Sequence, residues 1–312
     1  MEVWGWLIAI YLFLGGVGAG AYLTSLAADQ GVFGHAPQLK RIGYIISAPV
    51  VGSGAGILVL DLGQGLHKPW LLIGLLSNPH SVMSWGTGIL SVFICLGLVR
   101  GFLAWRNKRA PKWLDYAGAM FAVATAVYTG MLLAAVKAIP FWHNYLLPLL
   151  FLISALSTGM SATTAIAQFL EKEQTDHRPV CLAHVVLVGA ELIILVTIFT
   201  LIFSGLFGPI ALQSGTMLLF DRFAAVFWLL LVCLGLVGPL SLYIYNHKHH
   251  AGQLAAGILP NSTDNPKSPV TIIKMVSQTK YLVCDMAVLI GGLSLRCLFI
   301  FAAIPVWNGI LS

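Results

Sequence analysis

The sequence contains few charged residues for its length. Of its 312 residues only 9% are Asp, Glu, Lys or Arg, whereas 58% are hydrophobic. An ordinary soluble domain carries about a quarter charged residues, so a charged surface could not cover this many apolar side chains. The composition therefore predicts a protein dissolved in lipid, and it argues against a nucleic-acid partner.

Cysteines are also few and scattered. The five are Cys95, Cys181, Cys233, Cys284 and Cys297, and no two form a C-x-x-C pair. Iron–sulfur clusters and structural zinc sites need several clustered thiolates, so we expect neither in this protein. The histidine-rich segment 247–250 belongs to a long polar connection, and we interpret it as a solvated loop rather than a metal site.

Long apolar runs dominate the rest of the sequence. A membrane-spanning helix needs about 20 mostly apolar residues, and eight runs are long enough. They predict an all-α membrane protein, a single polytopic domain over residues 1–312, whose eight helices form two four-helix bundles. The expected spans are Trp4–Ala28, Ile42–Leu62, His80–Leu103, Trp113–Val136, Asn144–Leu170, Leu182–Phe207, Phe220–Tyr245 and Tyr281–Ile304.

Lysine and arginine predict the orientation of these helices. The first, third, fifth and seventh connections carry about thirteen basic residues and the others about three, so the positive-inside rule places the first set in the cytoplasm. Both termini then face the periplasm of a bacterial inner membrane. The longest connection, residues 246–280, is expected to be a cytoplasmic loop.

The candidates for charged side chains deep within the predicted spans are few: Asp61, Glu191, Asp285 and Arg296. A charge near the bilayer centre costs about 2.5–3.5 kcal/mol on insertion scales, so such residues usually have a function. Glu191 and Asp285 could outline a proton route toward the cytoplasm, and Arg296 could balance the charge of Asp61. A protonated, hydrogen-bonded structural carboxyl group remains the alternative for Glu191.

Polar and aromatic residues gather in the predicted outer leaflet. At 1.5 Å per residue, Tyr11 lies about 10 Å below the outer surface and Tyr128 about 22 Å along a helix that rises outward. The same leaflet receives Asp61, His80, Ser84, Trp85, Trp142, His143 and Arg296. Because random placement would divide such residues between both leaflets, we expect a buried polar pocket that opens to the outer side. The alternative is an aromatic belt with hydrogen-bonded core residues.

A pocket of this composition suits a quinone headgroup. The flat ring carries two oxygens that need hydrogen-bond donors, and its redox change requires an ionisable group that exchanges protons. Tyr11 and Tyr128 could donate to the oxygens. Asp61, with help from His80 or His143, could exchange the protons.

In such a pocket, Trp85 and Trp142 would form the walls.

Two other functions use similar residues. A proton-coupled secondary transporter would use the carboxylates, although transporters favour unwound helices near the midplane. A haem b site needs axial histidines at one depth; His80 and His143 share a leaflet, whereas His184 lies near the inner end of its helix.

Seven strings stand in order between residues 11 and 159, within a resemblance that covers nearly the whole sequence. They are Tyr11–Ala21 (YLFLGGVGAGA), Asp61–Gly63 (DLG), Met83–Gly86 (MSWG), Tyr128–Leu133 (YTGMLL), Pro140–Trp142 (PFW), Leu147–Leu152 (LPLLFL) and Ser154–Gly159 (SALSTG). Together they resemble the NrfD/PsrC family of polysulfide-reductase-type membrane subunits. The resemblance implies an eight-helix, haem-free subunit that binds menaquinone or another quinone near the periplasmic face.

The resemblance also implies partners and site residues. Members of the family anchor an iron–sulfur subunit, and often a molybdopterin catalytic subunit, in anaerobic respiration. Electrons pass between quinol and the clusters, so the anchor oxidises quinol or reduces quinone but does not act on the terminal substrate. The resemblance places the quinone-site positions on Tyr11 and Tyr128 and the acidic position on Asp61. Ile8 stands where some relatives carry Asn, one turn before Tyr11.

Overall fold

The computed structural model describes residues 5–34, 36–61, 82–170, 177–244 and 269–305. Within these ranges the regular structure is helical, with no strand. Eight of the helices are long and apolar enough to cross a membrane, which confirms the all-α membrane fold. The helices are α1 (Trp6–Asp29), α2 (Pro37–Asp61), α4 (Val82–Trp105), α5 (Lys112–Ala134), η1 (Pro140–Trp142), α6 (Leu146–Leu170), α7 (His177–Phe203), α8 (Gly208–Leu219), η2 (Val226–Val237) and α10 (Pro269–Phe301).

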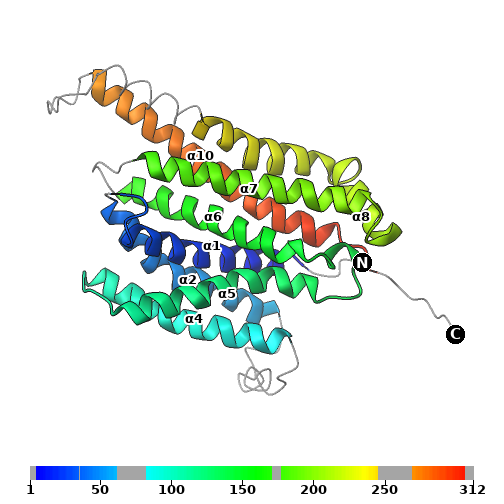
Figure 1. Ribbon diagram of the computed structural model, residues 1–312, viewed down its shortest axis with the longest axis horizontal. Helices are drawn as coiled ribbons and strands as arrows, with labels where there is room; N and C mark the ends of the chain where they lie inside the picture. Colours follow the sequence, from blue (N-terminus) through cyan, green and yellow to red (C-terminus); the bar gives the residue numbers. More distant parts are fainter. Residues whose placement is uncertain (1–4, 35, 62–81, 171–176, 245–268, 306–312) are drawn as a thin grey trace.

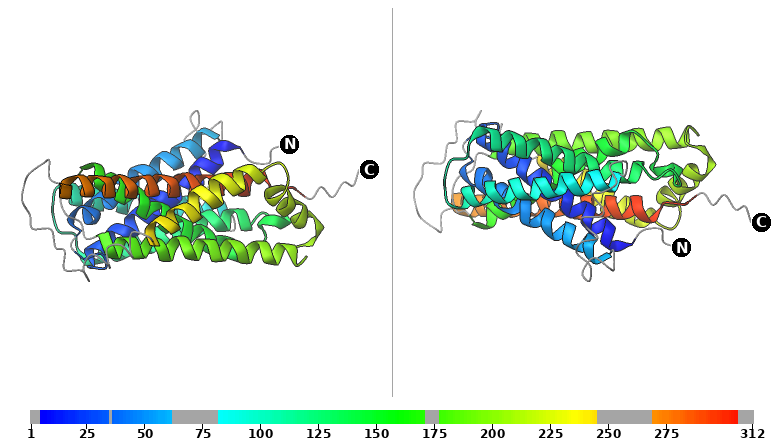
Figure 2. Two further views of the ribbon diagram at one scale, coloured as in Figure 1. Left: turned by 90° about the horizontal axis from the view of Figure 1, so that it is seen from above. Right: turned by 90° about the horizontal axis from the view of Figure 1, so that it is seen from below.

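The eight long helices form two four-helix bundles (Figure 1). In the first bundle α1, α2, α4 and α5 pack in a ring, and in the second α6, α7, η2 and α10 do the same. Helix α6 joins the rings, because it packs against α1 and α5 as well as against α7 and α10. The two further views show the helices running side by side along one direction (Figure 2).

Helix α1 begins and α10 ends at the same end of the molecule, here called the termini end. The rings of Trp6 and Phe301 meet there, with centroids 4.6 Å apart. The short elements η1 and α8 also lie at this end (Figure 1). The basic residues predict that the termini end faces the periplasm; the orientation of the protein in a membrane stays a prediction.

Glycines bring α1 and α6 into backbone contact. A Cβ atom on Gly20 would overlap the carbonyl group of Ala155, and one on Gly159 would overlap the backbone of Gly20 and Ala21. Small residues at a crossing let membrane helices approach closely. The joint between the two bundles therefore depends on these two positions.

Replacing Gly159 with alanine is expected to destabilise the protein by about 1–3 kcal/mol, because the added methyl group has no space against α1. Gly52→Ala is the matched control, since a Cβ atom at that helical position meets no neighbouring heavy atom within 4 Å. Thermal unfolding of the two purified variants in detergent compares them. Equal melting temperatures would contradict the importance of this crossing.

Some elements differ from the expected spans. Helix α8 occupies residues expected to form a connection, and α10 begins at Pro269, upstream of the expected start at Tyr281. The seventh span begins as a π-helix, η2, and continues as a helix to Ile244. The histidine-rich segment 247–250 lies outside the described residues.

Candidate functional site

Tyr11 and Tyr128 lie at similar depth near the termini end. At 1.5 Å per residue, Tyr11 is about 8 Å from the start of α1 and Tyr128 about 9 Å from the end of α5. Tyr11 is 0% exposed, Tyr128 is also buried, and the two phenol groups are close enough to interact electrostatically. Gly86 of α4 leaves room for the ring of Tyr128. Three helices of the first bundle thus enclose two phenol groups.

The hydroxyl group of Tyr11 has no hydrogen-bond partner among the described residues. Burying a hydroxyl group without a partner costs about 1–3 kcal/mol. A partner from outside the protein would remove this cost, and a quinone carbonyl oxygen is an acceptor of the right kind. The surrounding residues therefore fit a flat ring with acceptor oxygens.

Trp142 of η1 belongs to the same buried apolar cluster as Tyr11 and Tyr128. It is fully buried and donates its Nε1–H to the carbonyl oxygen of Phe299 over 2.7 Å. This hydrogen bond fastens η1 to the last turn of α10. The predicted wall residue is thus held rigidly on the termini side of the cluster.

The other predicted pocket residues are placed differently. Trp85 is 65% exposed and His143 is also exposed, so both side chains lie largely on the molecular surface. The side chain of Asp61 and the whole of His80 fall outside the part of the protein that the structure describes. Their predicted roles in the site stay predictions.

Arg296 of α10 is fully buried where the two bundles meet. Its guanidinium group donates to the carbonyl oxygens of Leu12 (3.3 Å) and Gly292 (2.7 Å) and to the hydroxyl oxygen of Ser154 (3.1 Å). Gly16 of α1 makes room for this group, because a Cβ atom there would lie only 2.7 Å from Arg296 Nη2. That Nη2 atom has no hydrogen-bond partner among the residues that the structure describes.

The carboxyl group of Glu191 of α7 lies within electrostatic reach of Arg296. It is buried, accepts a hydrogen bond from Ser157 over 2.9 Å and interacts electrostatically with the guanidinium group. Buried charges are tolerated in membrane helices when they are paired in this way. In the described structure Arg296 therefore interacts electrostatically with Glu191, whereas its predicted interaction with Asp61 involves a side chain outside the described residues.

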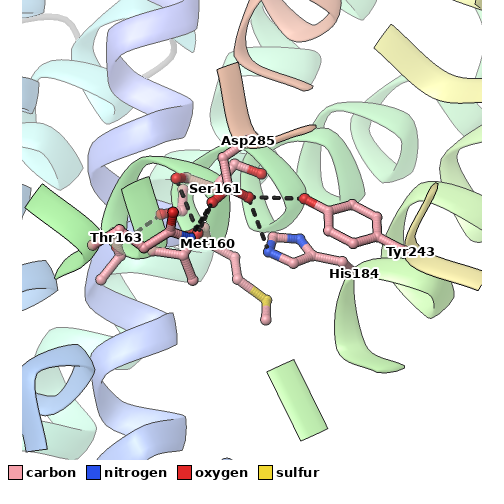
Figure 3. Close-up of polar contacts among 9 residues, drawn as sticks. Met160, Ser161, Thr163, His184, Tyr243 and Asp285 are labelled. Atoms are coloured by element: carbon pink, nitrogen blue, oxygen red, sulfur yellow. Dashed lines mark hydrogen bonds and ion pairs between the residues drawn. The ribbon is translucent and has the colours of Figure 1, made fainter. Parts of the chain in front are cut away.

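A second buried carboxyl group, Asp285 of α10, lies about 16 Å farther from the termini end than Arg296 along the same helix, and Figure 3 shows its contacts. Its contacts are the Tyr243 hydroxyl group (2.8 Å) and His184 Nε2 (3.4 Å) at Oδ1, and the Thr164 hydroxyl group (2.8 Å) and Gln168 amide (3.4 Å) at Oδ2. The rings of His184 and Tyr243 stack with centroids 4.6 Å apart and planes within 4°. Four helical spans therefore converge on one carboxyl group.

A row of hydroxyl groups on α6 lies between the two carboxyl groups. Its members are Ser154, Ser157, Ser161 and Thr164, all buried. Their spacing of three or four residues places them on one helix face. The first two contact Arg296 and Glu191, and the last contacts Asp285. The row extends about 15 Å along α6, so a polar strip runs through the second bundle.

The partners of Asp285 are not predicted by the sequence. The sequence suggests His184 only as a possible haem ligand, and it predicts no role for Tyr243 or Thr164. One signal is available: His184 and Glu191 are seven residues apart, which puts both on one face of α7. The contacts across helices cannot be derived from spacing.

A further buried charged group ties the first bundle together at the end opposite to the termini end. Arg100 of α4 pairs with Asp115 of α5, lies 3.7 Å from Asp29 of α1, and stacks over the ring of Tyr44 of α2 at 3.7 Å. The arginine is thus neutralised by carboxylates within its own bundle. We interpret this group as a structural tie.

Eight apolar helices around buried phenol, carboxyl and guanidinium groups define a multi-pass integral membrane protein with an internal polar site. The chain belongs to the family described as "Polysulphide reductase, NrfD", which matches residues 2–262. This membership confirms the resemblance seen in the sequence. It also fits the predicted location in a bacterial inner membrane.

Individual relatives are similar over much of their length. This protein is 29% identical to one of the polypeptides of polysulfide reductase from Wolinella succinogenes, over 80% of its own residues and 86% of that polypeptide. It is 31% identical to protein NrfD of Escherichia coli, over 77% and 84% of the two proteins. This protein is also 30% identical to one of the subunits of tetrathionate reductase from Salmonella typhimurium, over a shorter match that covers 48% of this protein and 45% of that subunit.

Proposed function

We propose that this protein is the membrane anchor and quinone-binding subunit of a multisubunit respiratory oxidoreductase. It passes electrons between menaquinol and an iron–sulfur partner subunit on the periplasmic side. Family membership, and relatives named as reductase subunits, support the anchor role. The quinone supplies the electron and proton chemistry, while the residues of this protein bind the ring and move protons.

The buried, unpartnered hydroxyl group of Tyr11, next to Tyr128, carries this proposal. A phenol group donates one hydrogen bond and offers a flat face to a neighbouring ring. Tyr11 and Tyr128 would donate to the ring oxygens, and Trp142 would close the site toward the termini end. The remaining members of the predicted site are Asp61, His80, Trp85 and His143.

Proton exchange at the ring would begin at Asp61, the last residue of α2, with His80 or His143 assisting. Arg296 donates to the carbonyl oxygen of Leu12, the residue after Tyr11, so its guanidinium group lies beside the proposed site. From there, Glu191 and Asp285 would extend proton transfer into the second bundle along the hydroxyl row. Electron transfer would then be coupled to proton translocation.

Asp61→Asn is expected to lower quinol-linked electron transfer by about a hundredfold or more while the complex still assembles, because an amide of similar size cannot accept the proton. A quinol oxidation assay on membranes measures the rate. Asp221→Asn is the matched control, since Asp221 is exposed just after α8 at the termini end. Full activity of Asp61→Asn would remove this residue from the mechanism.

The partner subunits would dock at the termini end. The second connection, residues 63–79, is expected to contribute to this surface but lies outside the described residues; the described elements at the termini end include η1 and α8. Co-purification with an iron–sulfur polypeptide, and with a molybdopterin or other catalytic subunit, is the expected result. A protein that purifies alone and moves a solute across liposomes would favour a proton-coupled transporter.

A further inference from the structure

The groups that surround Asp285 are all able to donate hydrogen bonds. They are two hydroxyl groups, an amide and an imidazole ring, and all four lie on helices other than α10 at 2.8–3.4 Å. Asp285 itself is 1% exposed. Such a set of donors favours the ionised carboxylate, although a lone negative charge is costly inside a membrane.

Among the described residues, only His184 is placed to neutralise this charge directly. Its Nε2 is 3.4 Å from the carboxyl oxygen, whereas Arg296 lies farther along α10, by about 16 Å at the helical rise. A neutral imidazole ring beside a carboxylate carries one negative charge. The pair is therefore neutral overall only when one further proton is bound to either group. That proton can reside on the imidazole ring or on the carboxyl group.

Both ring nitrogens of His184, Nδ1 and Nε2, are buried, and neither has a hydrogen-bond partner in the described part of the protein, so Nε2 contacts Asp285 only as an ion pair at 3.4 Å. Buried polar atoms of this kind are usually satisfied by internal water. An imidazole ring that can receive a proton on one nitrogen and release another from its second nitrogen is suited to proton transfer. Because Nε2 is the nitrogen beside Asp285, Nδ1 is the point of entry for a proton.

We infer that His184 and Asp285 form a proton-transfer pair that exchanges protons between the bundle end opposite to the termini end and the hydroxyl row of α6. This inference rests on the proposed quinone function, which supplies the demand for protons. A proton arrives at Nδ1 of His184, and the Nε2 proton passes to Asp285 Oδ1. The carboxyl group then gives its proton through Thr164 to the row, and no electron moves in these steps.

The depth of the pair fits this role. His184 and Asp285 each lie about 8 Å inside the ends of their membrane spans, which begin at Pro179 and Lys280. The pair thus lies nearer to the predicted cytoplasmic end of these two spans than to the termini end. Toward the termini end, Thr164 begins the hydroxyl row that leads to Glu191.

Tyr243 acts as a positioning residue for the pair. Its hydroxyl group donates to the carboxyl oxygen that faces His184, and its ring stacks on the imidazole ring. Cys181, one turn before His184, donates its thiol hydrogen to the carbonyl oxygen of Tyr243 over 3.1 Å. These contacts fix the plane of the imidazole ring and hold Nε2 3.4 Å from Asp285 Oδ1.

The test uses the purified complex in liposomes with a pH-sensitive dye inside and a short-chain quinol or quinone as the probe. Turnover is driven from outside by an electron donor or acceptor for the partner subunit that cannot cross the membrane. The dye therefore reports only on complexes whose opposite end faces the lumen. His184→Gln and Asp285→Asn are expected to lower proton exchange with the lumen by about ten- to a hundredfold. Binding of the probe to the same variants should be unchanged.

Two controls separate proton transfer from a structural role. Thr164→Val should slow proton exchange, whereas Thr163→Val should not, because the neighbouring Thr163 only bonds back to Gly159 of its own helix. Asp285→Glu should restore exchange, since it keeps an ionisable group. If Asp285→Asn cannot be purified, His184→Gln still carries the test, because its amide can donate to Asp285.

Two results would overturn the inference. One is exchange at the wild-type rate in His184→Gln with the complex intact, and the other is wild-type turnover without any exchange with the lumen. In either case, the proposed quinone function would still be supported if substitutions of Tyr11 and Tyr128 weaken binding of the probe. Loss of that dependence would instead contradict the quinone function itself.

Discussion

Arg296→Met is expected to destabilise the protein by about 3–5 kcal/mol and to abolish recovery of an intact, quinone-binding subunit. The substitution removes the hydrogen bonds to Leu12 of α1 and Ser154 of α6, which link the two bundles. It also leaves Glu191 as an uncompensated buried charge. Fluorescence-detected size exclusion and thermal unfolding in detergent measure the effect.

A double variant tests whether charge pairing is the cause. Arg296→Met combined with Glu191→Gln should be more stable than Arg296→Met alone, because no uncompensated charge remains. The hydrogen bonds to Leu12 and Ser154 stay lost, so the recovery should be partial. Additive effects of the two substitutions would contradict a direct interaction between Arg296 and Glu191.

Tyr11→Phe is expected to weaken quinone binding by about tenfold, which corresponds to one lost hydrogen bond of about 1.4 kcal/mol. Phenylalanine keeps the ring and its packing but removes the hydroxyl group. Tyr128→Phe should have an effect of similar size, and the double variant should lose measurable quinol-linked turnover. Titration of the purified subunit with a quinone analogue, followed by tryptophan fluorescence, gives the affinities.

Tyr44→Phe is the matched control for these variants. The hydroxyl group of Tyr44 is also buried without a hydrogen-bond partner among the described residues, but it lies on α2 beside Arg100 at the opposite end. Its removal should leave quinone affinity unchanged. Equal losses in Tyr44→Phe and Tyr11→Phe would show that general packing, not a ligand contact, is responsible.

The sequence is sufficient to predict the spans, because a run of about 20 apolar residues has few alternatives to a membrane helix. It does not predict α8, since a twelve-residue helix is too short to register as a span. The π-helix η2 is also not predicted. Its sequence, VFWLLLVCLGLV, is as apolar as that of an α-helical span, and hydropathy does not distinguish the two.

The chemistry of the candidate site is only partly predictable. Charged residues in apolar runs are conspicuous, so Glu191, Asp285 and Arg296 can be found from the sequence. Their neighbours cannot, because the approach of Glu191 to Arg296 and the contact of Asp285 with His184 depend on how distant helices pack. Depth along a helix follows from 1.5 Å per residue, but the direction of a side chain does not.

Trp85 illustrates this limit of the sequence. The depth estimate places it in the same leaflet as Tyr128, yet its side chain is exposed on the surface of α4. In a soluble protein the polar face of a helix marks the outside. A membrane helix is apolar on the lipid-facing side as well, so the sequence does not show which face packs inward.

The most direct measurement of the proposed quinone site is a structure of the complex with bound menaquinone. The ring should lie between Tyr11 and Tyr128, with one ring oxygen within hydrogen-bond distance of the Tyr11 hydroxyl group. A quinone ring bound away from both tyrosines, with the Tyr11 hydroxyl group satisfied by water alone, would contradict the proposed site.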